Sequence, residues 1–349
     1  MVSACIVLVG ISYLMLNVLS GMVITPKTPV EEVSLAGELA VPLEGAEIFS
    51  MQVSVDGRFL AYTATKESVG GAVLRVVELE TGDRVAFEQE IYGGKIAWLG
   101  NTSFIVYEDG RDINLLDVET GARNNLTASP EQDSDPIPSP DGRYILWTIL
   151  QEGANGESPS FWLMRADGTE KEFLAEAQAL AVWDSSGGRV MSRHDIAISE
   201  GGEASRYFLQ TAVLGKQGWE QYVECDGEVS FIWWPSRDTV LYVGPLLIKG
   251  QDVIKGVWSR AEQPDRVKKV ASTDGLGFEE SHYSFYPSRV DEQLAYVGVK
   301  GLEYLDYEER VIYRYTNLEA RTPLAWNEAA NEIFYIGPDG IYRVGVGGE

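Results

Sequence analysis

A short turn followed by an apolar strand recurs through most of this chain and constrains its fold more than any other feature. The clearest copy is Ser-Pro-Asp-Gly-Arg-Tyr-Ile-Leu-Trp at 139–147. Pro140 presets its own φ and Gly142 tolerates a positive φ, so both favour a tight turn, while the large apolar residues suit a buried strand. Comparable points recur 40–52 residues apart, at the anchor residues Ser54, Trp98, Ser139, Trp183, Trp234, Tyr286 and Trp326.

Each copy contains enough chain for four strands. An aromatic residue follows most anchors by eight to ten positions, and a second turn such as the one at 80–82 comes later in several copies. Four strands in about 40–45 residues is the period of one blade of a β-propeller. The anchors therefore predict an all-β fold, a seven-bladed β-propeller of four-stranded blades.

The repeats resemble a known class. Ser-Pro-Asp-Gly-Arg at 139–143 with Leu-Met-Arg-Ala-Asp-Gly-Thr at 163–169 is similar to the WD40-like (PD40-type) repeats of TolB-like propellers. Ile-Asn-Leu-Leu-Asp-Val-Glu-Thr-Gly at 113–121, followed by Asn-Leu-Thr at 125–127, is similar to them too. The resemblance implies the propeller fold. Families with this repeat include periplasmic binding propellers and the gating propellers of some serine peptidases, so no single function comes with it.

The last copy lacks a fourth strand. We expect strands near 323–326, 332–336 and 341–346, after which the chain ends. An open edge at that point would expose a template for strand pairing. We therefore predict that residues 38–43 pair with 341–346 and close the ring, and Pro42 is acceptable in such an outermost strand.

The segment 4–24 contains no charged residue. As a helix it would span about 31 Å, close to the hydrocarbon thickness of a bilayer, and Pro26 would end it. No Lys or Arg precedes it, so the basic start of a signal peptide is missing, and we predict an uncleaved transmembrane helix. The alternatives are a cleaved signal with secretion of the propeller, a buried core helix and a filament-forming helix. The predicted domains are an anchor at 1–25, a linker at 26–34 and a propeller at 35–349.

The chain carries 53 Asp and Glu against 28 Lys and Arg, a formal net charge of −25. Nucleic acids and anionic lipid surfaces require clusters of Lys and Arg, so this balance argues against both as partners. A soluble, self-repelling surface is the simplest interpretation. The resemblance to TolB-like propellers behind an anchor implies a periplasmic or extracellular location.

No catalytic or cofactor motif is recognisable. The Gly-x-Ser-x-Gly of serine hydrolases and a Gly-rich phosphate loop before a helix are both missing, and the two histidines, His194 and His282, are far apart in the sequence. The acidic pairs at 108–109 and 133–135 lack the pattern of a calcium loop. Tryptophans at repeat-equivalent positions are expected to pack between sheets. We therefore predict no enzyme activity, catalytic residue, cofactor or metal.

The loops between the second and third strands of each copy vary in length, and binding usually occurs on such loops. They are extended at 66–71, 151–160, 198–205 and 244–256, and the blade topology sends all four to one face. Aliphatic side chains there would form an apolar centre and carboxylates an acidic rim, as in a protein interface. The predicted partner-binding residues are Leu246, Leu247, Ile248, Lys249, Glu152, Asn155, Glu200 and Glu203.

Together these features predict a membrane-anchored, non-enzymatic propeller that binds a protein partner and serves as a scaffold or accessory subunit of an envelope or membrane assembly. Two alternatives stay open. One is an extracytoplasmic ligand-binding or enzymatic propeller that uses the axial channel. The other is a structural subunit that polymerises through the N-terminal helix.

Overall fold

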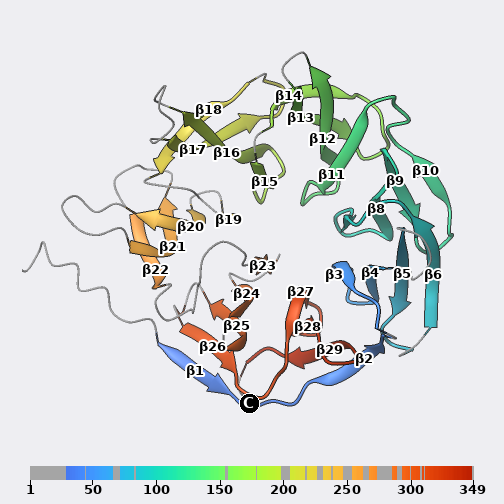
Figure 1. Ribbon diagram of the computed structural model, residues 1–349, viewed down its shortest axis with the longest axis vertical. Helices are drawn as coiled ribbons and strands as arrows, with labels where there is room; N and C mark the ends of the chain where they lie inside the picture. The colour runs from blue at the N-terminus through green and yellow to red at the C-terminus, as the bar shows by residue number, and fades with distance from the viewer. Residues whose placement is uncertain are drawn as a thin grey trace, which may run out of the picture.

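The computed structural model describes residues 29–347, except residues 44, 66–70, 82–83, 154–155, 178, 198–204, 217, 226–230, 237–238, 247–253, 262–266, 273–284, 289–292, 299, 307–308 and 310. The regular elements of this part are all β-strands, and they form seven sheets around a common axis (Figure 1). In the five sheets made of consecutive strands, the first strand lies nearest the axis and the last lies at the periphery.

Five sheets are formed by four consecutive strands each, and we number them as blades one to five. Blade one contains β3 (Ile48–Val53), β4 (Phe59–Thr65), β5 (Ala72–Glu78) and β6 (Arg84–Ile91). Blade two contains β7 (Ile96–Trp98), β8 (Phe104–Asp109), β9 (Asp112–Asp117) and β10 (Arg123–Asn125). Blade three contains β11 (Gln132–Pro138), β12 (Tyr144–Gly153), β13 (Gly156–Arg165) and β14 (Glu172–Glu176). Blade four contains β15 (Ala179–Trp183), β16 (Arg189–Ala197), β17 (Ser205–Val213) and β18 (Glu220–Cys225). Blade five contains β19 (Phe231–Ser236), β20 (Thr239–Leu246), β21 (Ile254–Ala261) and β22 (Val267–Ser272).

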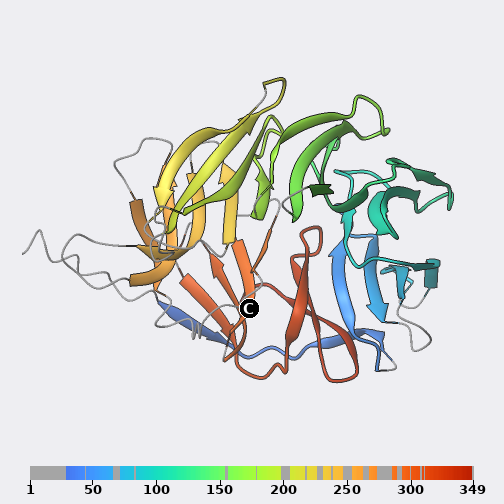
Figure 2. The same cartoon turned by 45° about the horizontal axis from the view of Figure 1, so that its top comes forward.

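The other two sheets combine strands that are far apart in the sequence. Blade six contains β23 (Phe285–Pro287), β24 (Gln293–Gly298), β25 (Gly301–Asp306) and β26 (Val311–Tyr315), with β1 (Val30–Val33) on its outer edge. Blade seven contains β27 (Arg321–Asn327), β28 (Glu332–Ile336) and β29 (Gly340–Gly345), with β2 (Glu38–Pro42) on its outer edge. In Figures 1 and 2 the blue strands β1 and β2 run along the outside of the red blades.

The ring is closed by β2, which pairs with β29 in antiparallel orientation. Glu38 lies opposite Arg343, and the Arg343 guanidinium donates a hydrogen bond to the Glu38 carboxylate at 3.0 Å. Val41 is buried in the core between blades seven and one. The predicted pairing of residues 38–43 with the last strand is therefore confirmed.

The predicted fold requires correction in two respects. The blades are not uniformly four-stranded, because β1 pairs in parallel with β26 and gives blade six a fifth strand. Part of the predicted linker at 26–34 is thus a strand, held there because Val33 is buried and because an open sheet edge supplies backbone partners. The transmembrane helix is not shown: none of the described segments is a helix of membrane-spanning length and apolarity, and residues 4–24 lie outside the described range.

The turn between the first and second strands is held by the same hydrogen bonds in different blades. In blade three the Ser139 hydroxyl donates to Asp141 at 2.7 Å and accepts the backbone N–H of Tyr144 at 3.0 Å. Residues 54–59 repeat this arrangement in blade one. Burial by itself would raise the pKa of Asp141, but hydrogen bonds from Ser139 and Arg143 hold that pKa below its ordinary value. The recurring sequence motif is therefore a recurring turn.

Glycines let the turns of neighbouring blades touch one another. Gly57 has a φ of +72°, and a Cβ there would lie 2.8 Å from Asn327 Oδ1 and from the Ala329 side chain of blade seven. Gly100 and Gly142 meet in the same way between blades two and three. We call this side of the ring the turn face. The opposite side, with the second-to-third and blade-to-blade connections, is the loop face.

Replacing Gly57 with Ala is expected to lower the free energy of unfolding by about 1–3 kcal/mol, because an alanine there is strained at positive φ and collides with blade seven. Chemical denaturation measures the loss. The matched control is Gly121→Ala, which has the same φ of +72° but nothing within 4 Å of the added Cβ. Equal losses in the two variants would show that the contact between turns contributes nothing.

Tryptophans join neighbouring blades through their indole N–H groups. Three of them, all at least nine-tenths buried, donate to a backbone carbonyl on the innermost strand of the preceding blade: Trp98 to Gln52 at 3.3 Å, Trp183 to Ile137 at 2.9 Å and Trp326 to Tyr286 at 2.7 Å. For these residues the prediction of packing between sheets is confirmed. Each indole therefore fills apolar space between two blades and also donates a hydrogen bond across the boundary between them.

Candidate functional site

The predicted partner-binding residues cannot be assembled into a site from the described part of the chain. The side chains of Glu152 and Leu246 are outside it, although their backbones lie in β12 and β20. The other six predicted residues lie wholly outside it: Leu247, Ile248, Lys249, Asn155, Glu200 and Glu203. Their role stays a prediction.

Two of the predicted long loops are shorter than expected, because the flanking strands continue into them. In blade three β12 and β13 pair as far as Gly153 opposite Gly156, so most of 151–160 is a hairpin. In blade five β20 pairs with β21 as far as Leu246 opposite Ile254. Sequence analysis placed the strand ends too early because the ends carry polar residues or glycine.

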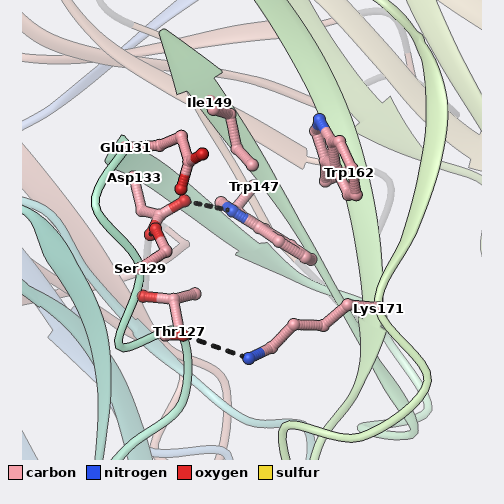
Figure 3. A pocket seen from close by; sticks show the side chains of 8 residues that line it. All are labelled: Thr127, Ser129, Glu131, Asp133, Trp147, Ile149, Trp162 and Lys171. Atoms are coloured by element: carbon pink, nitrogen blue, oxygen red, sulfur yellow. Dashed lines mark hydrogen bonds between the residues drawn. The ribbon is translucent and has the colours of Figure 1, made fainter. Parts of the chain in front are cut away.

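A cavity of about 200 Å³ lies between blades two and three (Figure 3). Its walls come from the connection between β10 and β11, from β11, β12 and β13, and from the residue before β14. The lining residues are Thr127, Ser129, Glu131, Asp133, Trp147, Ile149, Trp162 and Lys171.

A buried carboxylate organises one wall of this cavity. Asp133 is 3% exposed, and its two oxygens accept hydrogen bonds from Trp147 Nε1 at 2.8 Å and from the Ser129 hydroxyl at 2.8 Å (Figure 3). Its backbone N–H donates to the Arg111 carbonyl on the connection between β8 and β9. A carboxylate buried without such donors would be strongly unfavourable, so Asp133 and Trp147 stabilise each other's placement.

Two indole rings form the apolar part of the lining. The ring centres of Trp147 and Trp162 lie 6.2 Å apart, with an interplanar angle of 42°. Trp162 Nε1 donates to the Ser160 hydroxyl at 3.0 Å, so both indole N–H groups have partners within the protein. Trp147 is 1% exposed and Trp162 is half-buried, so Trp162 supplies most of the indole surface that remains for apolar contact.

Opposite charges line the same cavity. Lys171, which precedes β14, donates from Nζ to the Thr127 carbonyl at 3.2 Å, and Glu131 lies on the other side of Trp147 (Figure 3). Among the described residues neither side chain forms an ion pair. Sequence analysis missed this pair, since Glu131 and Lys171 belong to different strand connections and no local spacing links them.

The loop face carries two exposed aromatic side chains at the same end of blade one, Phe49 near the start of β3 and Tyr92 directly after β6, which we call the aromatic patch. Phe49 is 50% exposed and sits at an irregularity in the pairing of β3 with β4, where Ile48 faces Ala64 and Ser50 faces Thr63. A β-bulge of this kind turns a side chain out of the regular alternation.

Tyr92 is 71% exposed, but its backbone is fixed. Its N–H donates to Asp109 Oδ1 at 3.0 Å, and its carbonyl accepts the N–H of Gly110 at 2.6 Å. Gly94, two residues later, packs directly against Phe49. The two rings are therefore presented by a rigid backbone.

The described residues contain no group of three or more His, Cys, Asp or Glu side chains that could hold a metal ion. Asp133 and Glu131 are two carboxylates of the cavity lining, and Asp133 already accepts two hydrogen bonds there. The cavity therefore offers groups that can recognise a ligand, namely an ammonium group, a carboxylate and indole surface.

Comparison with known proteins identifies the fold. No family model and no curated protein matches the chain. Solved structures do, among them the β-propeller domain of the Trilobed protease from Pyrococcus furiosus, with 12% identity, a TM-score of 0.61 and coverage of 85% of this chain and 95% of that one. The acylaminoacyl peptidase of Pyrococcus horikoshii is 13% identical with a TM-score of 0.61, and the match covers 86% of this chain but 51% of the peptidase. The oligogalacturonate lyase of Vibrio parahaemolyticus is 10% identical with a TM-score of 0.56, over 90% and 98% of the two chains.

These similarities are to the β-propeller alone, and of the predicted fold they confirm only that it is a β-propeller. The neighbours include peptidases and a lyase, and the chain spans about half the length of the acylaminoacyl peptidase. Because the identities are far below 25%, the likeness shows the fold alone, and the activities are stated only of those proteins.

Proposed function

We propose that this protein is a non-enzymatic scaffold that binds a protein partner through the loop face of its propeller. The observation that carries the proposal is the aromatic patch. Singly scattered exposed apolar residues are normal on protein surfaces. Phe49 and Tyr92 differ in being large, in lying at the same end of blade one and in being held by a fixed backbone, which are properties of residues that anchor protein interfaces.

The position and the charge of the loop face also support the binding of a protein partner there. The turn face is occupied by contacts between blades, as Gly57 and Gly142 show, whereas the aromatic patch lies on the other side of the ring. Carboxylates flank the patch at Glu47 and Asp109, and the whole chain is acidic. A partner with a basic rim around an apolar contact has the complementary charge.

Replacing both Phe49 and Tyr92 with Ser is expected to abolish partner capture without unfolding the protein. Both side chains are at least half exposed, so the free energy of unfolding should change by no more than about 0.5 kcal/mol for each. The measurement is affinity capture of the full-length protein from detergent-solubilised envelope of its source, followed by mass spectrometry. Partners captured by the wild type should be missing from the double variant.

The matched control for this experiment is Phe173→Ser. Phe173 is also an exposed aromatic residue, 41% exposed, but it lies on β14 at the outside of blade three. Its variant should capture the same partners as the wild type. If Phe173→Ser loses the partners and the double variant keeps them, binding occurs elsewhere and the role of the loop face is refuted.

The same proposal places the propeller at a membrane surface outside the cytoplasm, tethered by the apolar residues 4–24. Its support is the absence of charge over that stretch together with the resemblance of the repeats to TolB-like propellers. Deleting 4–24 should move the protein from the membrane fraction to the soluble fraction of lysed cells. Recovery of the deleted protein in the membrane fraction would show that the segment is not the tether.

The non-enzymatic part of the proposal rests on the sequence, where no hydrolase, metal or nucleotide motif occurs. The propellers of similar structure include both peptidases and a lyase, so the fold leaves this point to the site itself.

A further inference from the structure

Two triplets of blade two match the acceptor pattern for N-linked glycosylation, Asn-x-Ser/Thr. They are Asn101-Thr102-Ser103, in the turn between β7 and β8, and Asn125-Leu126-Thr127, which begins at the last residue of β10. The pattern by itself ranks the two triplets equally. The hydrogen bonds around the two asparagines separate them.

The side-chain amide of Asn125 is part of the fold. Its Nδ2 donates to Asp112 Oδ2 at 2.8 Å, and its Oδ1 accepts the backbone N–H groups of Thr127 at 3.1 Å and of Ala128 at 2.8 Å. The hydroxyl residue of this triplet, Thr127, is 7% exposed, and its Oγ1 accepts the N–H of Ile113 at 3.0 Å. An enzyme that must reach this amide and this hydroxyl would have to break the bonds that hold the chain at the end of β10.

The side-chain amide of Asn101 is not used in this way. Asn101 is exposed, and no described residue forms a hydrogen bond with its amide. The turn is closed by its neighbour instead, since the Thr102 hydroxyl donates to the Leu99 carbonyl at 2.6 Å and accepts the N–H of Phe104 at 3.2 Å. A substituent on the Asn101 amide therefore leaves the hydrogen bonds of the turn intact.

The hydroxyl residue of the first triplet is also more accessible than that of the second. Ser103 is half-buried, and its hydroxyl donates to Asp117 Oδ1 at 3.1 Å. Asp117 is itself partly exposed, so water can replace this bond when the hydroxyl turns to another partner. The structure thus favours the triplet at 101–103 as the acceptor.

The position of Asn101 is compatible with a partner on the loop face. Its turn lies on the turn face, directly after Gly100, which contacts Gly142 of blade three. A glycan is bulky and polar, so it covers surface and excludes other proteins from it. On the turn face it would leave the aromatic patch, on the opposite side of the ring, open to a partner.

We propose that Asn101, and not Asn125, carries an N-linked glycan. In the transfer, Asn101 Nδ2 forms a bond with the anomeric carbon of a saccharide whose donor is a lipid-linked phosphate. The bond between that carbon and the phosphate oxygen breaks, its electron pair stays with the phosphate, and the amide loses one proton to a base of the transferase. The inference rests on the proposed location outside the cytoplasm, since the acceptor pattern applies to proteins that reach that side of the membrane.

The first test examines the site independently of the location. Full-length protein from a host without N-glycosylation is incubated with a lipid-linked oligosaccharide and a purified oligosaccharyltransferase that requires only the Asn-x-Ser/Thr triplet. Mass spectrometry then maps the products. Synthetic peptides covering 96–106 and 120–130 are the matched controls, and both should accept the saccharide. The folded protein should accept it at Asn101 alone. Transfer to Asn125, or no transfer to Asn101, overturns the proposal.

The second test uses the protein purified from its source. The peptide that contains Asn101 should be heavier than its sequence by the mass of the saccharide. Asn101→Gln should remove the added mass, and so should Ser103→Ala, which keeps the asparagine but removes the hydroxyl of the triplet. Asn124→Gln is the control, because Asn124 is exposed and begins no triplet, and it should keep the added mass. Thermal melts confirm that each variant is folded.

An unmodified Asn101 in the protein from its source overturns the proposal, as does added mass that survives Ser103→Ala. The two tests together distinguish the reasons for failure. Transfer to Asn101 in the first test with no glycan in the second would show that the site is accessible and that the proposed location outside the cytoplasm is wrong.

Discussion

Replacing both Val33 and Val41 with Asp is expected to remove most of the stability of the propeller. The two valines are 5% and 8% exposed, and they anchor β1 and β2 on the outer edges of blades six and seven. A buried, unpaired carboxylate costs about 3–5 kcal/mol at each position. The double variant would thus lose an amount comparable with the total stability of an ordinary domain, about 5–15 kcal/mol.

The effect should spread beyond the two outer strands, because they tie the start of the propeller to its end. Val41 packs in the core shared by blades seven and one, and Val33 packs in the core shared by blades six and seven. Without β2 the last blade keeps three strands and an open edge. Thermal unfolding followed by circular dichroism and gel filtration would record a large drop in melting temperature and an expanded or aggregated chain.

The matched control is Glu32→Ser. Glu32 belongs to the same strand as Val33 but is exposed, so its replacement should change the free energy of unfolding by no more than about 0.5 kcal/mol. If the double Asp variant unfolds at the temperature of the wild type, β1 and β2 are not held on the sheet edges in solution.

Replacing Trp147 with Ala is expected to have the second largest effect. The free energy of unfolding should fall by about 3–5 kcal/mol from the lost packing and the space that the indole leaves behind. Trp147 is 1% exposed and fills the core between blades two and three. The substitution also removes the indole donor of Asp133, whose carboxylate stays buried, and an unmet buried acceptor costs about 1–3 kcal/mol more. Chemical denaturation with linear extrapolation measures the sum.

Trp147→Phe separates the two contributions. Phenylalanine keeps much of the apolar volume but has no N–H to donate to Asp133, so its loss should be the smaller one, about 1–3 kcal/mol. Phe173→Ala, at an exposed aromatic residue of the same blade, is the control and should cost far less than either. A loss as large for Trp147→Phe as for Trp147→Ala would mean that packing contributes little and the hydrogen bond dominates.

The features that sequence analysis predicted correctly depend on interactions within a blade or on a simple count of strands. The turn at 139–143 forms from its own residues, since Ser139 and Asp141 bond within it. The closing strand could be predicted because the last repeat lacked a strand and residues 38–43 formed a lone strand ahead of the first blade. The packing of tryptophans between neighbouring blades could be predicted because they recur at one position of the repeat.

The features that sequence analysis missed depend on contacts between distant segments. The four residues of β1, Val-Glu-Glu-Val, carry no strand signal of their own, and they are extended because the edge of β26 offers backbone partners. Glu131 and Lys171 line one cavity because β11 and the start of β14 meet the connection from blade two.

Phe49 shows most clearly which features follow from the sequence and which depend on the tertiary structure. The sequence by itself determined that residues 48–53 are an apolar strand, since strand formation follows from residue type and alternation. Only the tertiary structure decided that Phe49 faces solvent. The irregular register between β3 and β4 places Ile48 and Ser50 opposite consecutive residues of the partner strand and leaves Phe49 without one. Alternation is a local property, whereas register is set by the neighbouring strand, so the exposed ring on which the proposed interface depends could not be found without the fold.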